Sequence, residues 1–206
     1  MKMNTYIAGP IDANNYLLWD EKSKEAVLID CSEYKQEIID FVKKNNLNVK
    51  YILLTHGHFD HVLGLNEMSV ALNAKVGIHE NDIVLLDNIN EFSKFVGFPH
   101  VEIPKYDFNV KDGDELSFGD LNIKIIHTPG HTEGGICYLT DGKLFSGDTL
   151  FKGSYGRTDL FGGNFLKIEH SINDIIFELD DNIEVYPGHG ESSNLKYEKL
   201  HNDINR

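Results

Sequence analysis

The feature that most constrains this chain is a group of potential metal ligands directly after an apolar segment. Residues 51–54 (YILL) predict a strand buried on both faces, and residues 55–61 (THGHFDH) follow it at once. The group consists of His56, His58, Asp60 and His61. Imidazole and carboxylate side chains are typical ligands of zinc, iron and manganese. Because four donors are more than one structural site takes from a single turn, we expect two metal ions to share this segment.

Two further histidines and one aspartate occupy similar positions. His131 follows a Pro-Gly pair at 129–130 and His189 follows another at 187–188, each directly after or close to an apolar strand. Pro-Gly forces a sharp turn, so both imidazoles are expected on rigid strand ends. Asp148 also ends an apolar strand, and a carboxylate with two acceptor oxygens is suited to bridge two cations. We therefore expect these three side chains to complete the metal site.

The remaining pattern predicts a sheet-rich α/β chain with helices outside. Short apolar runs predict strands at 15–19, 26–30, 75–78, 121–126, 136–139, 143–146 and 184–186, and helical periodicity covers 62–73, 165–179 and 193–205. The aromatic stretch 92–99 contains glycine and proline and is expected to form a loop that could cover a pocket. With 206 residues and no linker, we expect one domain spanning 1–206.

Charge and cysteine content limit the partners. The formal net charge of −14 disfavours nucleic acid and anionic membranes, which leaves a small molecule as the expected partner. Two cysteines are too few for a disulfide framework, and no apolar run reaches the ~18 residues of a transmembrane helix. The expected location is the cytoplasm. Nothing in the sequence fixes the oligomeric state.

The ligand pattern resembles the metallo-β-lactamase superfamily. The motif H-x-H-x-D-H at 56–61, then His131, Asp148 and His189, follows that order and spans most of the chain. The resemblance implies a four-layer αβ/βα sandwich with the metals at one edge between two sheets. It also implies that one cation takes His56, His58 and His131 and the other takes Asp60, His61 and His189. Asp148 and a water or hydroxide would bridge them.

Within the superfamily, the chain looks closest to short, bacterial-type glyoxalase II-like hydrolases. Residues 153–159 (GSYGRTD) are similar to the glycine-rich loop of those enzymes, in which the residue matching Arg157 can meet the glutathione part of the substrate. Full glyoxalase II enzymes have an additional helical C-terminal region that supplies further glutathione contacts, and because only 17 residues follow His189 we expect the glutathione site to be incomplete here. Asp148 stands where zinc β-lactamases with the matching histidines have cysteine, which disfavours antibiotic hydrolysis.

The resulting functional prediction is a dinuclear metal hydrolase of thioesters such as S-lactoylglutathione. A bridging hydroxide would attack the carbonyl, with Asp60 orienting it, and zinc is expected before iron or manganese. The first alternative is a persulfide dioxygenase, which the loop at 156–159 also resembles and which would hold one iron at His56, His131 and Asp148. The others are a lactonase or phosphoesterase, and a metal-binding domain without activity. The other five histidines are expected to be surface or hydrogen-bonded residues.

Overall fold

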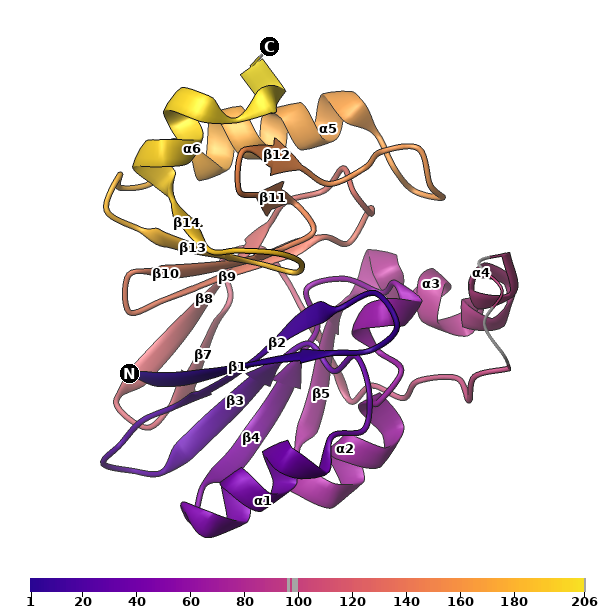
Figure 1. The fold of residues 1–206 in the computed structure, drawn as a ribbon, viewed down its shortest axis with the longest axis vertical. Coiled ribbons are helices and arrows are strands. Elements are labelled where there is room, and N and C mark those ends of the chain that lie inside the picture. Colours follow the sequence, from indigo (N-terminus) through magenta and orange to yellow (C-terminus); the bar gives the residue numbers. More distant parts are fainter. Residues whose placement is uncertain (96, 98–99, 206) are drawn as a thin grey trace.

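The computed structural model describes residues 1–95, 97 and 100–205 and contains two mixed six-stranded sheets (Figure 1). The first has the strand order β1-β2-β3-β4-β5-β6. Its antiparallel part precedes a parallel part that starts with the pairing of β3 and β4. These strands are β1 (Lys2–Ala8), β2 (Ala13–Trp19), β3 (Glu25–Ile29), β4 (Asn48–Leu53), β5 (Lys75–His79) and β6 (Phe108–Val110).

The second sheet has the order β14-β13-β10-β9-β8-β7, in which β10 and β13 are parallel and the other pairs antiparallel. Its strands are β7 (Glu115–Phe118), β8 (Leu121–His127), β9 (Ile136–Thr140), β10 (Lys143–Gly147), β13 (Glu184–Pro187) and β14 (Ser193–Asn194). A separate ribbon pairs β11 (Leu150–Phe151) with β12 (Ser154–Tyr155). The strands predicted at 136–139 and 143–146 pair as a hairpin, with Asp141 and Gly142 at positive φ in its turn.

Helices cover the outer face of each sheet (Figure 1). The first sheet carries α1 (Gln36–Lys44) and α2 (Leu65–Leu72), and the second carries α5 (Phe165–His170) and α6 (Leu195–His201). A π-helical segment at Ser171–Ile176 extends α5, while α3 (Ile83–Asp87) and α4 (Ile89–Phe95) follow β5. Short 3₁₀ segments occupy Phe59–His61, Glu80–Asp82 and Asp203–Asn205. No helix in the described part of the chain is long and apolar enough to cross a membrane.

Three buried clusters define the layers. Ile38 and Met68 belong to a cluster between the first sheet and its helices, while Ile172 and Leu195 belong to the corresponding cluster on the second sheet. The third cluster lies between the sheets and contains Tyr138 and Phe145, both fully buried. These three clusters bury the apolar faces between successive layers, and this burial stabilises the order helices, sheet, sheet, helices. The predicted four-layer αβ/βα sandwich is therefore confirmed.

Several element boundaries differ from the predictions. Strand β1 was not predicted, because its outward-facing residues give it little apolar character. The helix expected at 62–73 starts at Leu65, since the ligand turn before it is 3₁₀-helical. The loop expected at 92–99 is wrong in part, because α4 extends to Phe95; residues 96, 98 and 99 lie outside the described residues. The last helix starts at Leu195, where the Asn194 side chain caps it by accepting from Tyr197 N–H.

Candidate metal centre

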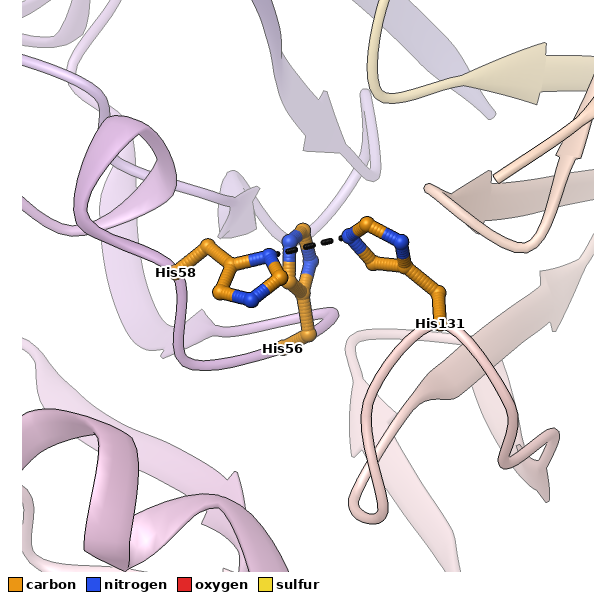
Figure 2. Close-up of side chains that lie close together, drawn as sticks. All are labelled: His56, His58 and His131. Carbon is orange, nitrogen blue, oxygen red and sulfur yellow. Dashed lines mark hydrogen bonds between the residues drawn. The ribbon is translucent and has the colours of Figure 1, made fainter. Parts of the chain in front are cut away.

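The seven side chains predicted as metal ligands converge at one edge of the sandwich, between the two sheets. His56 and His58 come from the turn after β4, and His131 comes from the turn after β8 (Figure 2). The Nδ1 atom of His58 lies 2.9 Å from Nε2 of His131. The three imidazoles point toward one another, and their potential ligand atoms lie within 4.8 Å of each other. This group matches the first predicted ligand set.

The second predicted set comes together beside the first. Nε2 of His189 lies 3.2 Å from Oδ2 of Asp60 and 3.2 Å from Nε2 of His61. The residue before His189 must be glycine for this approach, because a Cβ at Gly188 would stand 2.2 Å from Oδ1 of Asp148 and 2.9 Å from the His61 ring. The ligand atoms of Asp60, His61 and His189 again lie within 4.8 Å of one another.

Asp148 lies between the two sets. Its Oδ2 is 3.6 Å from Nε2 of His131 and 3.7 Å from Nε2 of His189, while its Oδ1 is 3.5 Å from Nε2 of His61. One carboxylate therefore faces both groups of imidazoles. Asp148 also forms a group with His56 and His61 whose ligand atoms lie within 4.8 Å of one another.

Two buried polar atoms in this cluster have no hydrogen-bond partner, namely Nε2 of His56 and Oδ1 of Asp148. An unpaired buried acceptor costs free energy, so two such atoms at the centre of one cluster fit residues that hold a metal ion. A divalent cation would be coordinated by both. The donor set of five imidazoles and two carboxylates fits this assignment, because zinc, iron and manganese all accept these ligands.

Neighbouring groups fix the orientation of the imidazoles. The Thr55 hydroxyl donates to Asp30, and its oxygen lies 3.1 Å from Nδ1 of His56, which can therefore donate to it. Nδ1 of His61 lies 2.8 Å from Oδ2 of Asp30. Likewise, Nδ1 of His131 is 2.8 Å from the Arg157 carbonyl oxygen and Nδ1 of His189 is 3.1 Å from that of Ile11. In all four imidazoles the Nδ1–H group has a hydrogen-bond acceptor, so the lone pair on Nε2 is left to coordinate a cation.

Two buried aspartates that support the site were missed by the sequence analysis. Asp30, directly after β3 with φ of 59°, accepts from the amide and hydroxyl of Thr55 and from His61. Asp82 accepts from the amides of Gly57 and Gly134 and from the Thr132 hydroxyl, and so joins the two turns that carry His56 and His131. A single aspartate at a strand end is ordinary in a sequence, and only tertiary contacts distinguish these two.

Burial and mutual repulsion keep two imidazoles neutral. Burial, followed by the neighbouring histidines, holds the pKa of His56 well below its usual range. Burial and then His131 lower the pKa of His58 to about 3. Neutral imidazoles are the form that binds a cation, so His56 and His58 need lose no proton at neutral pH.

The neighbouring pair behaves differently. Burial alone would lower the pKa of His61, but the carboxylates of Asp60, Asp30 and Asp148 raise it to about 10. Burial alone would raise the pKa of Asp60, yet His61 and His189 hold it well below its usual range. Without a cation, the charged forms of Asp60 and His61 stabilise each other, and a bound cation would replace the imidazolium proton.

A cavity of about 610 Å³ opens beside these residues. His58, Asp60, His131, Asp148 and His189 line one side of it. Arg157 also lines the cavity, but its guanidinium forms two hydrogen bonds with Asp159, at 2.7 and 2.9 Å. The predicted contact of Arg157 with a substrate stays a prediction. Among the described residues, none of the five remaining histidines belongs to a group that could hold a metal, and His79 and His127 stack on each other.

An αββα sandwich with clustered histidines and aspartates at one sheet edge defines a class of metal-dependent hydrolases. Comparison with known sequences agrees: the family described as "Metallo-beta-lactamase superfamily" matches residues 8–189. The hydroxyacylglutathione hydrolase GloC of Haemophilus influenzae is 34% identical over 92% of this chain and 91% of its own. The probable metallo-hydrolase YqgX of Bacillus subtilis is 32% identical over 98% and 96%, respectively. The chain belongs to the metallo-β-lactamase superfamily and is a metallo-hydrolase of that superfamily.

Solved structures give the same result. The BLEG-1 B3 metallo-β-lactamase superimposes with a TM-score of 0.90 at 32% identity, covering 98% of this chain and 99% of its own. TTHA1623 in a di-iron-bound form has a TM-score of 0.87 at 30% identity, covering 98% and 99%. ETHE1 from Myxococcus xanthus has a TM-score of 0.81 at 28% identity, covering 98% and 84%.

Proposed function

We propose that this metallo-hydrolase cleaves thioesters, with S-lactoylglutathione as the first substrate to test, and that its seven clustered ligands hold two divalent cations. The observation that carries the proposal is the position of Asp148, whose two oxygens face the imidazoles of both ligand sets within 3.7 Å. A carboxylate that faces two sets is suited to a pair of cations rather than to one. Zinc is the first expectation, and iron or manganese are the alternatives.

When bound, the two cations would supply a hydroxide near neutral pH and positive charge for the developing oxyanion. The chain supplies position and orientation. Asp60 lines the cavity and remains ionised because His61 and His189 hold its pKa low, so it can accept a hydrogen bond from the attacking water. We assign Asp60 the role of orienting the attacking water. Asp30 keeps His61 in place through the Nδ1 contact.

Two considerations support a thioester as the substrate. The relative GloC, 34% identical over most of both chains, is named a hydroxyacylglutathione hydrolase. A thiolate is a good leaving group, so the reaction does not depend on a protein acid placed next to the departing sulfur. The cavity of about 610 Å³ falls within the ~300–1,000 Å³ of small-molecule sites.

The test combines metal analysis with hydrolysis assays on the same preparation. We expect two metal equivalents per chain and hydrolysis of S-lactoylglutathione, measured by thiol release. A β-lactam is the comparison substrate, because BLEG-1 is described as a B3 metallo-β-lactamase, and it is expected to react far more slowly. Metal-loaded protein that releases no thiol from any thioester would overturn the proposal.

A persulfide dioxygenase is the second candidate, since the loop at 156–159 resembles that family. Such an enzyme would use a single iron at His56, His131 and Asp148. It would leave Asp60, His61 and His189 without a metal, although their ligand atoms lie as close together as those of the first set. Oxygen uptake with glutathione persulfide and one iron per chain would favour this candidate.

A further inference from the structure

One wall of the cavity is apolar and built from segments that are far apart in the sequence. We call it the apolar wall and define it by the following six residues. They are Ile11, Phe92, Phe151, Tyr155, Leu160 and Phe161. They come from the β1–β2 turn, α4, the β11–β12 ribbon and the segment before α5. The wall lines the same cavity as the metal ligands and adjoins them at His189, whose Nδ1 lies 3.1 Å from the Ile11 carbonyl oxygen and whose ring centroid lies 6.3 Å from that of Phe151.

Part of this wall is exposed although it is strongly apolar. The exposed fraction is 57% for Phe161 and 49% for Ile11. Phe161 nevertheless meets Phe92, with ring centroids 5.6 Å apart, so α4 and the segment before α5 meet at the cavity. In Figure 1 both segments lie on the right-hand side of the view. Large exposed apolar side chains gathered at a cavity mark a binding surface, since a ligand that covers them removes apolar area from water.

The charges around the mouth do not favour an anionic ligand. Arg157 is the single basic side chain among the described residues that line the cavity, and it pairs with Asp159. Lys152, next to Phe151, pairs with Glu191 at 2.6 Å, and Lys167 in α5 pairs with Glu133 at 2.6 Å. Each of these three cations is therefore matched by a carboxylate, within a chain of net charge −14. Outside the metal centre, the two carboxylates of a glutathione arm therefore meet none of these three cations without a carboxylate already paired to it.

We propose that the cavity selects thioesters in which the acyl or the thiol group is apolar and uncharged, and that this group rests on the apolar wall. The inference rests on the proposed thioesterase function and refines its substrate class. Phe161 is then a residue that determines specificity rather than a catalytic one. Its exposure means that its truncation should leave the fold intact.

The test uses two series of thioesters with the metal-loaded protein. The first varies the acyl group from acetyl to hexanoyl and benzoyl on one neutral thiol. The second compares S-acetyl thioesters of glutathione and of benzyl mercaptan, a neutral thiol whose sulfur is also bonded to an alkyl carbon. We expect kcat/KM to rise by roughly tenfold from acetyl to hexanoyl or from glutathione to benzyl mercaptan, as expected for about two buried methylene equivalents. The series that shows the rise identifies which half of the substrate lies on the wall.

Variants at position 161 connect the preference to the wall. Phe161→Ala should lower kcat/KM about tenfold for the preferred apolar substrate and change it less than about twofold for acetyl-glutathione. Phe161→Leu should restore most of the loss, and Phe161→Lys should shift the preference toward S-lactoylglutathione. Leu200→Ala is the matched control, because Leu200 is an exposed apolar residue of α6 that does not line the cavity.

The outcomes separate this inference from the proposed function. If S-lactoylglutathione is cleaved at least as well as every apolar thioester and Phe161→Ala has no selective effect, the inference is wrong and the thioesterase function stands. If no thioester is cleaved, the function is wrong. Calorimetry then tests the apolar wall without any reaction, with ketone analogues in which CH₂ replaces the thioester sulfur. Equal affinities of the acetyl and hexanoyl ketones for the metal-free chain would overturn the inference about the wall.

Discussion

The Nδ1 atom of His61 lies 2.8 Å from Oδ2 of Asp30, and both side chains are fully buried. Asp30 thereby leaves Nε2 of His61 facing the site. The same carboxylate accepts a hydrogen bond from the Thr55 hydroxyl, whose oxygen lies 3.1 Å from Nδ1 of His56. One buried aspartate therefore positions two potential ligands, one from each end of the turn after β4.

Asp30→Asn tests this positioning role. An amide presents N–H where the carboxylate accepts, so it would oppose the donor of His61 or of Thr55. We expect metal affinity to fall roughly 10- to 100-fold, the usual effect of losing such an orienting partner. Competition with a chromophoric chelator measures it, and circular dichroism checks the fold. Asp40→Asn, at an exposed position of α1, is the control and should change neither.

The two ligand sets predict a stoichiometry of two metals per chain. His58→Ala removes a ligand of the first set only, and His189→Ala removes one of the second only. We expect each variant to retain about one metal equivalent after dialysis, measured by plasma emission spectrometry. One metal in the wild-type protein, unaffected by His189→Ala, would contradict the paired site.

Asp148→Asn addresses the proposed bridge. Since Asp148 faces both sets, loss of its charge should affect both cations, and activity should fall by several orders of magnitude. The melting temperature of the metal-free protein should change little, because the sheets are held by their apolar clusters. Near wild-type turnover with two metals bound would mean that no bridging charge is needed.

The clustering of the seven candidate ligands was predictable from the sequence, but much of what supports these side chains was not. Residues 56–61 are close in the chain and follow an apolar strand, so their convergence needs only local geometry. Asp82 lies 25 residues from Gly57 and 52 from Gly134, and no local pattern relates these positions. Residues 92–95 of α4 are predicted as loop because the stretch 92–99 contains glycine and proline. The apolar runs predict only a sheet-rich α/β chain, and the four-layer sandwich is implied by the family resemblance; β1 has too few inward-facing residues to be recognised.

The pH dependence of the metal-free protein follows from His61. Its pKa is raised to about 10 in the folded chain, above the unfolded value of about 6.5. The imidazolium therefore contributes stability that is complete below pH ~6.5 and is lost as the pH rises toward 10. His56 and His58 have lowered pKa values, so their effect on stability is confined to lower pH.

Thermal unfolding of the metal-free protein, kept in a chelator, tests whether stability falls as the pH rises. Between pH 6.5 and 8.5 we expect the melting temperature of the wild-type protein to fall steadily. The fall should be smaller in His61→Gln, which has no titrating imidazole at this position. Above this range the thiols of Cys31 and Cys137 would ionise in the unfolded chain, at a pKa of about 8.5, while burial raises their pKa well above that value in the folded protein, and this difference would lower the melting temperature for a second reason. A wild-type melting temperature that rises over this range would contradict the assignment.

The last prediction concerns Arg157, which lines the cavity while its guanidinium is paired with Asp159. Both side chains are mostly exposed, so solvent screens the pair and a substrate carboxylate can compete with Asp159 for the guanidinium. We expect Arg157→Ala to raise KM for S-lactoylglutathione by roughly tenfold, as for the loss of a charged hydrogen bond, with little change for a neutral thioester. Asp159→Asn should act in the opposite direction, because it frees the guanidinium, and should lower KM for the anionic substrate severalfold. Steady-state kinetics of both variants on both substrates, with melting temperatures, provide the comparison. Equal losses on both substrates together with a lower melting temperature would show that the Arg157–Asp159 pair only shapes the loop, whose Arg157 carbonyl oxygen lies 2.8 Å from Nδ1 of His131.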